Sequence, residues 1–435
     1  MNLKRVILAV AMGTTFAACA YEVENVTARS RFPWNGLVDI DYEITGAKSG
    51  EAFAIDVTAS YSNGVCKLVG HTYKSSPIAG AGQNHLVWDM GADCPNVFAP
   101  DMKVAVSATP FGDKTPVYCV IDLSGGKDAE KYPVRYTTVA PVHSPQANDV
   151  CKTTELWFRR IRPNARSFTT RSGVTPKDSN SSYFSALTKD YYMSVFEMTQ
   201  QQWFLLTGTW PSRYSNETWR ATRPLQNVTV NDLRGKWGWP DDKSISADSP
   251  LKKLRTRTGI ARIDLPTEEQ WSFAETAGPV YKGSNPIYRY YKPDGKTTYS
   301  YSEVARTTTN SAGDNANDLC DPDSGTACVG SYAPNNFGLY DMLGNVRELC
   351  LNPYVATANI KTYYTNKGCE FPIMDPEGIP VKDAKEINGK TTLSATARGG
   401  GINQSEAYSD LWHVWDQSVS SANYNTGFRL CITCE

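Results

Sequence analysis

The sequence predicts an α+β protein of two domains, in which an N-terminal all-β sandwich precedes an irregular domain with little regular secondary structure. Three observations lead to this fold class. The length of 435 residues corresponds to two or three domains of about 150 residues each. Apolar and polar residues alternate in short runs up to about residue 144. From about residue 151 the chain changes to long segments rich in Asn, Ser, Thr, Gly and Tyr.

The first twenty residues have the organisation of a secretory signal peptide. Lys4 and Arg5 precede an apolar run at 6–11, and small residues follow at 17–20. Cleavage after Ala20 fits the small-x-small rule, whereas a lipoprotein interpretation would retain Cys19. The apolar run is shorter than the roughly 20 residues that span a bilayer, and no later segment is long enough and free of charge. We therefore expect an exported protein without a transmembrane segment, secreted, periplasmic or at the cell surface.

The composition is that of a folded protein and argues against nucleic acid as a partner. Hydrophobic residues make up 40% of the chain, and 44 basic residues balance 45 acidic ones. The 11 Trp and 24 Tyr residues are consistent with a large aromatic core, and also with a surface that recognises sugars or proteins.

Residues 21–144 are predicted to form the β-sandwich. The runs 37–42 and 103–108 alternate apolar with polar residues, and Gly, Asn and Pro punctuate the pattern. No catalytic constellation occurs in this part, so binding, spacing or anchoring is its expected role. Pro141 and Pro145 mark a linker before the second domain, which is predicted at 151–435.

Ten cysteines remain if Cys19 leaves with the signal peptide, and an even number in an exported chain favours disulfides. Proximity suggests Cys66 with Cys94, and Cys320 with Cys328, although connectivity cannot be deduced from sequence. The single CxxC, Cys431 to Cys434, and four widely separated histidines make a zinc site improbable.

Two helices are predicted in the second domain. Thr199 can cap the first, whose apolar face includes Trp203 and Leu206. For the second, Thr267 and Gln270 form a capping box, and Trp271 faces inward.

Five segments, in order, resemble motifs of the formylglycine-generating (sulfatase-modifying factor) family. The segment Phe196-Glu197-Met198-Thr199 resembles its Glu-Val-Thr motif, and Asp264-Leu265-Pro266-Thr267-Glu268-Glu269-Gln270-Trp271 its Arg-Leu-Pro-Thr-Glu-x-Glu-Trp motif. The remaining three are Asn336-Phe337-Gly338-Leu339-Tyr340-Asp341-Met342-Leu343-Gly344-Asn345-Val346, Arg398-Gly399-Gly400 and Gly427-Phe428-Arg429-Leu430. The resemblance implies an irregular C-type-lectin-like α+β fold over about 240 residues.

The same resemblance implies a structural calcium site. Two carboxylates seven residues apart bracket a glycine-containing turn, and carboxylate with carbonyl oxygens is the ligand set that Ca²⁺ prefers. The implied ligands are the side chains of Asp341 and Glu348 with the carbonyls of Gly344 and Val346. The alternative is that Asp341 caps a turn and Glu348 is a solvated charge.

The residues that would carry the family's oxidase chemistry are changed. In the oxidases a cysteine pair holds copper, because thiolates and Cu(I) are both soft. Gln404 and Ser409 stand at the two matching positions, and Arg347 and Leu349 stand where the family has the two Trp of Trp-Glu-Trp. Copper-dependent formylglycine generation on sulfatase cysteines survives as an alternative only if Cys350 or Cys369 reaches the site. With His413 alone in the second domain, a three-histidine iron site cannot form there.

The preferred function is a non-catalytic module that binds carbohydrate or protein at the cell surface. In binding proteins of this fold, the ligand contacts come from the loop that corresponds here to residues 401–426. Its polar and aromatic side chains offer hydrogen bonds and stacking faces, the requirements of such recognition. The candidate ligand-binding residues are Asn403, Gln404, Tyr408, Asp410, His413, Asn423 and Asn425.

Overall fold

The computed structural model divides the chain into two compact units, Met1–Pro116 and Val117–Glu435. It describes residues 7–8, 21–32, 36–47, 52–61, 66–70, 78–94, 97, 99, 101–110, 117–137, 139–145, 147–163, 167–171, 183–276, 299–311, 325–406, 409 and 413–434. The predicted signal peptide lies outside these residues except for Ile7 and Leu8. Among the described residues, no helix combines the length and apolarity that a membrane span requires.

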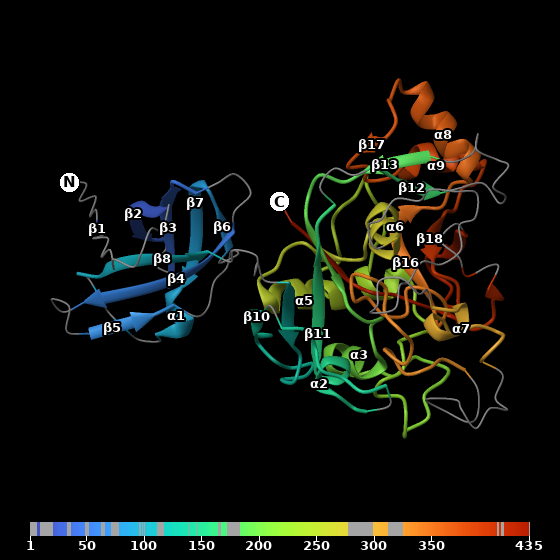
Figure 1. The fold of residues 1–435 in the computed structure, drawn as a ribbon, viewed down its shortest axis with the longest axis horizontal. Coiled ribbons are helices and arrows are strands. Elements are labelled where there is room, and N and C mark those ends of the chain that lie inside the picture. Colours follow the sequence, from blue (N-terminus) through green and yellow to red (C-terminus); the bar gives the residue numbers. More distant parts are fainter. Residues whose placement is uncertain are drawn as a thin grey trace. The chain divides into compact units, whose positions relative to one another are not determined.

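The first unit consists of two antiparallel sheets, which confirms the predicted all-β region (Figure 1). One sheet has the order β1-β2-β3-β7, and in the other β4 pairs with β5, β6 and β8. The strands are β1 (Ile7–Leu8), β2 (Glu22–Ser30), β3 (Leu37–Thr45), β4 (Ala52–Tyr61), β5 (Cys66–Val69), β6 (Ile78–Gly80), β7 (Gly82–Asp89) and β8 (Lys103–Pro110), with the single turn of α1 (Met90–Asp93) after β7.

The alternating pattern of the sequence explains how this unit builds its core. Along β3, Val38, Ile40, Tyr42 and Ile44 are buried, and the residues between them are partly exposed. Successive strand residues point to opposite faces, so one face of the strand supplies the core. Phe53, Val57 and Val104 from the other sheet complete the same apolar cluster.

The second unit contains a six-stranded sheet and two smaller sheets. The six strands have the order β10-β9-β11-β14-β21-β15, and the smaller sheets have the orders β12-β13-β17 and β19-β18-β16-β20. The strands are β9 (Tyr118–Asp122), β10 (Val134–Thr137), β11 (Glu155–Ile161), β12 (Ser167–Arg171), β13 (Tyr183–Ala186), β14 (Tyr191–Ser194), β15 (Ile263–Asp264), β16 (Arg347–Pro353), β17 (Ile373–Met374), β18 (Ser394–Arg398), β19 (Trp415–Ser418), β20 (Thr426–Gly427) and β21 (Cys431–Thr433).

Short helices and long irregular segments surround these sheets (Figure 1). The mixture of many strands and few helices confirms the predicted α+β fold class. The helices are α2 (Val150–Thr153), α3 (Gln200–Thr207), α4 (Val230–Arg234), α5 (Pro250–Thr258), α6 (Glu268–Thr276), α7 (Tyr301–Val304), α8 (Thr357–Asn366) and α9 (Val381–Asn388).

The boundary between the units lies earlier than the sequence suggested. The sandwich was expected to run to residue 144, yet β9 and β10 belong to the second unit. The reason is pairing: β9 forms an antiparallel ladder with β11, and β10 pairs with β9. Period-two alternation identifies strands but does not say which sheet they join.

Both helix starts were predicted correctly. Thr199 accepts a hydrogen bond from Gln202 N and caps α3, and Thr267 and Gln270 form the expected reciprocal bonds at the start of α6. Helix α6 packs against β12, β16 and β18 (Figure 1). Trp271 of this helix is fully buried, so α6 contributes to the interior of the second unit.

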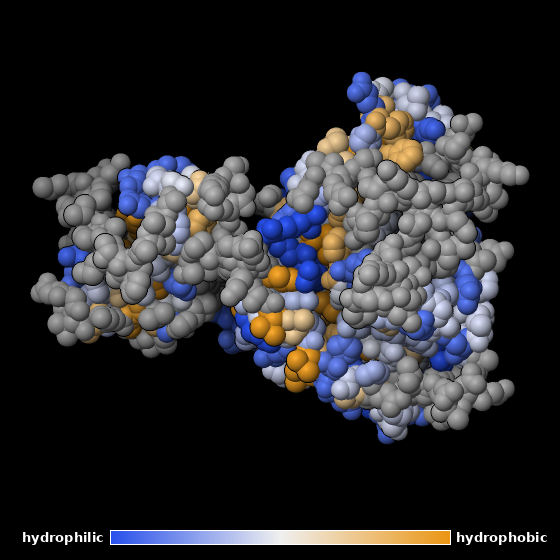
Figure 2. All heavy atoms as spheres, viewed as in Figure 1, coloured by the Kyte–Doolittle hydropathy of each residue, from blue (hydrophilic) through white to orange (hydrophobic). Residues whose placement is uncertain are grey.

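Figure 2 shows small apolar patches over the part of the chain that holds β10 and α2, where Val139, Val142 and Val150 are exposed.

Candidate functional site

The candidate site is built on a turn of consecutive glycines that follows β18. Gly399 and Gly400 have φ values of 84° and 74°, a left-handed conformation that glycine adopts without the penalty of a Cβ. A Cβ on Gly400 would lie 2.3 Å from Ser409 Oγ, and one on Gly401 would lie 3.1 Å from the carbonyl oxygen of Asn425. The absence of side chains at this turn therefore lets two other segments approach its backbone.

Gln404 and Ser409, which stand in place of the copper-binding cysteines, both lie against this glycine turn. Gln404 is 7% exposed, and its Oε1 accepts a hydrogen bond of 3.3 Å from Arg347 Nε. Ser409 is fully buried, and its carbonyl oxygen accepts a 2.8 Å bond from the hydroxyl of Tyr301. The structure thus brings the two replaced positions together, with an amide and a hydroxyl as their functional groups.

The two cysteines that could have replaced the lost pair lie elsewhere. Cys350 is buried in the cluster around Trp271 and Met342, where its thiol donates to the carbonyl oxygen of Glu348 at 3.8 Å. Burial raises the pKa of this thiol well above its usual range, so it stays protonated. Cys369 is exposed just after α8. Neither thiol has a described contact with Gln404 or Ser409.

Of the two predicted disulfides, one is wrong and the other involves a cysteine outside the described residues. Cys66 and Cys94 are both free, so the proposed pairing between them is wrong. Cys328 is disulfide-bonded, and its predicted partner Cys320 lies outside the described residues. Free cysteines in the described residues also include Cys119, Cys151, Cys431 and Cys434.

Arg347 is a residue of this site to which the sequence analysis gave no ligand-binding role. It begins β16, is only 9% exposed, and places its guanidinium carbon 3.8 Å from the ring centroid of Trp415. Burial lowers its pKa to about 10, although the negative charge of Asp416 opposes that effect. The available signal was the arginine itself, because it stands where the resembling family has a tryptophan.

The predicted ligand-binding residues divide into surface and supporting groups. Asn403 is exposed, and its Oδ1 accepts a bond of 2.5 Å from the amide of Asn425, which is fully buried. Asn423 supports the loop, since its carbonyl oxygen accepts from the backbone N–H groups of Asn227 and Thr426. Tyr408 and Asp410 lie outside the described residues.

His413 lies beside the same tryptophan as Arg347. Its ring stacks at 6.5 Å from that of Trp415, and both residues are partly exposed. The aromatic surface of this loop therefore carries an imidazole as well as a guanidinium.

A buried ion pair lies behind the site. Arg429 donates from Nε to Glu348 Oε2 and from Nη2 to Glu348 Oε1, each at 2.6 Å, and both residues are inaccessible to solvent. Trp271 Nε1 donates to the same Oε2 at 2.7 Å. This bidentate geometry is the arrangement in which a buried carboxylate and guanidinium compensate each other.

Two further buried carboxylates lie close to this pair. Glu197 accepts from the amide of Asn345 at 2.6 Å and from Val346 N at 3.1 Å. Asp341 Oδ2 accepts from Gly330 N at 2.7 Å, whereas Oδ1 is buried without a hydrogen-bond partner. Burial raises the pKa of Asp341 to about 6 and, with the charges of Asp341 and Glu348, raises that of Glu197 well above its usual range.

The implied calcium ligands fit a cation only in part. Asp341 keeps a buried carboxylate oxygen that a cation would satisfy, and positive φ values at Gly344 and Asn345 produce the expected turn. Both oxygens of Glu348, however, are already engaged by Arg429 and Trp271. Among the described residues, no three His, Cys, Asp or Glu side chains form a metal-binding group. Calcium therefore stays a prediction from the resemblance.

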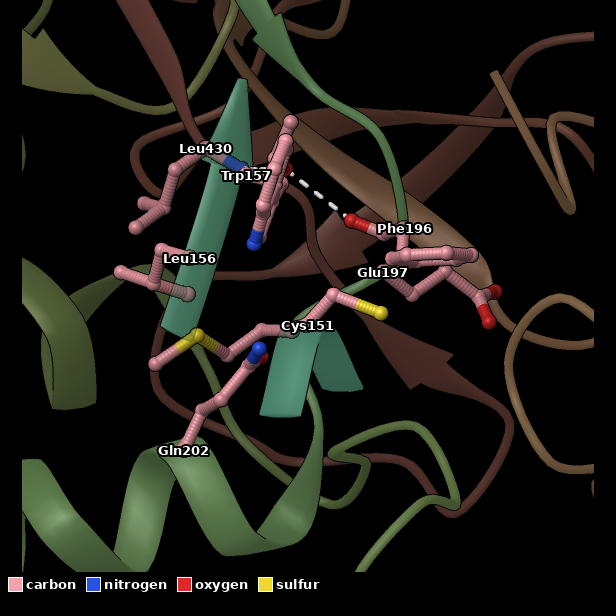
Figure 3. Close-up of a pocket in the computed structure, with 9 residues that line it drawn as sticks. Cys151, Leu156, Trp157, Phe196, Glu197, Gln202 and Leu430 are labelled. Carbon is pink, nitrogen blue, oxygen red and sulfur yellow. Dashed lines mark hydrogen bonds between the residues drawn. The ribbon is translucent and has the colours of Figure 1, made fainter. Parts of the chain in front are cut away.

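Two small cavities are described in the second unit, and neither is lined by Arg347, Gln404, Ser409 or the glycine turn. The cavity in Figure 3 has a volume of about 10 Å³ and is lined by residues such as Cys151, Trp157 and Gln202. The second, also about 10 Å³, adjoins Arg171, Tyr183 and Glu269. A volume of this size holds about one water molecule.

Glu269, beside the second cavity, gives a pH-dependent prediction. Burial, with the neighbouring charge of Glu268, raises its pKa from 4.5 to about 7. An acid with a raised pKa binds more protons when folded, so the stability it contributes is present below pH 4.5 and is lost as the pH rises to 7. Glu269→Gln should therefore gain stability relative to wild type by on the order of 3 kcal/mol between pH 4.5 and 7.5, at about 1.4 kcal/mol per pKa unit.

The measurement is urea unfolding of both proteins across this pH range, with Glu217→Gln, an exposed glutamate, as the control. A constant difference between Glu269→Gln and wild type at all pH values would show that folding does not raise the pKa of the Glu269 carboxyl.

Comparison with known proteins agrees with the architecture of the second unit. Residues 181–434 match the FGE-sulfatase family, described as the sulfatase-modifying factor enzyme 1-like domain. A chaperone protein, LppX, of Paenibacillus barcinonensis is 28% identical over 201 residues, which are 40% of this chain and 67% of that protein.

Solved structures of low sequence identity also match. Treponema denticola variable protein 1 is 17% identical with a TM-score of 0.43, over 68% of this chain and 100% of the other. PvdO from Pseudomonas aeruginosa is 20% identical with a TM-score of 0.44, over 67% and 100% respectively. Because the family match covers more than half of the chain and its motifs build the described interior, the protein belongs to the sulfatase-modifying factor enzyme 1-like family.

Proposed function

We propose that this protein is an exported binding module for a carbohydrate or protein ligand, and that it does not carry out the oxidase chemistry of its family. The observation that supports the proposal most directly is the pairing of Gln404 with Arg347 beside Ser409. The two positions that correspond to the copper-binding cysteines are close to the same glycine turn. One holds the amide of Gln404, which is hydrogen-bonded to the Arg347 guanidinium, and the other holds the hydroxyl of Ser409.

The chemistry of these groups is unsuited to copper. Cu(I) prefers soft thiolate or thioether ligands, and neither a carboxamide oxygen nor a serine hydroxyl is one. The adjacent guanidinium of Arg347 adds a positive charge that would repel a metal ion. A formylglycine-generating oxidase, the alternative function, would need a cysteine pair at this place.

The surface of the loop supports a binding role. Asn403, His413 and Tyr424 keep part of their surface accessible, and Asn425 and Asn423 hold the backbone beneath them. Such preorganised polar and aromatic groups reduce the entropy lost on binding. The name of the Paenibacillus relative, a chaperone protein, adds weight to a protein ligand. The N-terminal sequence pattern supports export.

The first experiment is an assay of the purified protein with Cu(I), oxygen and a cysteine-containing sulfatase peptide, read by mass spectrometry of the peptide. A family member that retains the cysteine pair serves as the positive control. We expect no formylglycine above the no-enzyme background and no bound copper. Formylglycine formation by this protein would refute the non-catalytic proposal.

The same preparation should be applied to glycan and extracellular-protein arrays. We expect one class of ligand to be retained and the binding to fall at least about fivefold in Asn403→Ala, with Lys189→Ala, exposed and without described contacts, as the matched control. Equal loss in both variants, or no retained ligand, would contradict a binding role for this loop.

A further inference from the structure

We propose that Arg347 is an anchor for an anionic group, a carboxylate or sulfate, on the ligand. This inference rests on the proposed binding function and names the chemistry that the loop recognises. The unusual feature is a nearly buried guanidinium that faces the predicted binding loop without a carboxylate as its direct partner.

The contacts of Arg347 leave its terminal nitrogens available. Nε donates to Gln404 Oε1 at 3.3 Å, and one face of the guanidinium lies 3.8 Å from the Trp415 centroid. Neither Nη1 nor Nη2 has a described hydrogen bond, and neither is among the described buried atoms that lack a partner. Arg347 as a whole is 9% exposed, and a guanidinium uses its two terminal nitrogens to bind carboxylate or sulfate oxygens in a bidentate manner.

The groups that hold Arg347 also preorganise it. Stacking on Trp415 fixes the plane of the guanidinium, and the hydrogen bond to Gln404 fixes the orientation of the guanidinium within that plane. The backbone N–H of Arg347 donates to the carbonyl oxygen of Asn425 at 2.8 Å, which ties β16 to the same loop. Little side-chain entropy remains to be lost when an anion binds, and the partial removal from water strengthens the interaction.

The charges around this position favour an anion. No described carboxylate lies within ion-pair distance of Arg347. Asp416 acts on it only at longer range and is exposed. A second arginine, Arg213, is exposed and lies 4.9 Å from the ring centroid of Tyr424, whose charge state also influences Arg347. Two cations and two aromatic rings thus occupy the surface at which the ligand is expected.

The experiment is an NMR titration of the full mature chain labelled with ¹⁵N-arginine, observing the Nε–Hε signals. The probes are sodium acetate for a carboxylate and sodium methyl sulfate for a sulfate ester, with choline chloride at equal ionic strength as the blank. The Arg347 signal is assigned by its absence from the spectrum of Arg347→Gln.

We expect a saturable shift of the Arg347 signal with at least one probe, and the stronger probe identifies the anion class. Arg347→Lys should bind about tenfold more weakly, measured by the acetate- or sulfate-dependent rise in melting temperature, because an ammonium lacks the planar fork. Asp416→Asn should bind the probe more tightly, since it removes the nearby competing charge.

Arg220 provides a matched control, because its guanidinium carbon lies 4.3 Å from the Trp210 centroid but in a more exposed position. Arg220→Gln should leave the titration unchanged. A shift no larger than that of the choline chloride blank, or a probe effect on stability that persists in Arg347→Gln, would overturn the proposal.

The outcomes are separable from those of the array experiment. If acetate or methyl sulfate binds at Arg347 but the arrays retain no ligand, the anion site is supported and the proposed binding function is rejected. If the arrays identify a ligand whose affinity is unchanged in Arg347→Gln, the binding function is supported and the anion site is rejected.

Discussion

Replacement of Arg429 by Met is expected to destabilise the protein by about 3–5 kcal/mol. The change leaves Glu348 as a buried carboxylate whose remaining donor is Trp271 Nε1. It also removes the donors to the carbonyl oxygens of Ser194 at 3.0 Å and Tyr340 at 2.8 Å. Removing one partner of a buried pair is costly, because the other charge stays out of water without compensation. Urea unfolding at neutral pH measures the loss.

The control is Lys243→Met, which breaks an exposed ion pair with Glu377 at 2.6 Å. Such surface pairs contribute at most about 1 kcal/mol, so this variant should remain close to wild type. The double variant Glu348→Gln with Arg429→Met should recover part of the loss, since no uncompensated charge remains. If Arg429→Met proved no worse than Lys243→Met, the Glu348 carboxylate would not depend on Arg429 to compensate its buried charge.

Replacement of Gly344 by Ala should cost roughly 3–5 kcal/mol, the sum of a left-handed backbone penalty and steric overlap. Gly344 has a φ of 74°, and an added Cβ would lie 2.3 Å from the carbonyl oxygen of Arg306 and 2.8 Å from its nitrogen. Both are backbone atoms, so no side-chain rotation relieves the clash. The carbonyl oxygen of Arg306 also accepts from Asn345 N at 2.8 Å, and the overlap would separate these segments.

A substitution at Gly389 separates the backbone penalty from the steric overlap. It ends α9 with a φ of 61°, and an added Cβ would meet no atom within 4 Å. Gly389→Ala should therefore cost only about 1 kcal/mol, the conformational term alone. Thermal and urea unfolding of both variants give the comparison. Similar losses at the two glycines would contradict the close approach of Arg306 to Gly344.

The sequence was informative about local structure and about the family. The predicted cap at Thr199 and the predicted capping box at Thr267 gave two helix starts correctly, because a cap depends on residues only three apart. The alternation at residues 37–42 predicted a strand of the all-β region, and β3 occupies these residues. The ordered motifs identified the family that the comparison confirmed.

Partnerships between distant residues were not predictable in the same way. Cys66 and Cys94 are close in sequence and lie in the same unit, but they remain free, because disulfide formation depends on the distance and direction of their Cβ atoms. Likewise, β9 and β10 lie within the range predicted for the sandwich and still belong to the second unit, since β11 pairs with β9.

The candidate site shows the same division between sequence and tertiary structure. The resemblance of the sequence to the family predicted that Gln404 and Ser409 stand where the oxidases have copper-binding cysteines, and that residues 401–426 form the candidate loop. The contact of Arg347 with Gln404, 57 residues later, and its stacking on Trp415 became visible in the folded chain. The tertiary structure also decided that Glu348 would pair with Arg429 across 81 residues. Such contacts form when two side chains from distant parts of the sequence are buried next to each other. Which side chains become neighbours depends on the packing of the whole chain, so a local sequence pattern does not predict it.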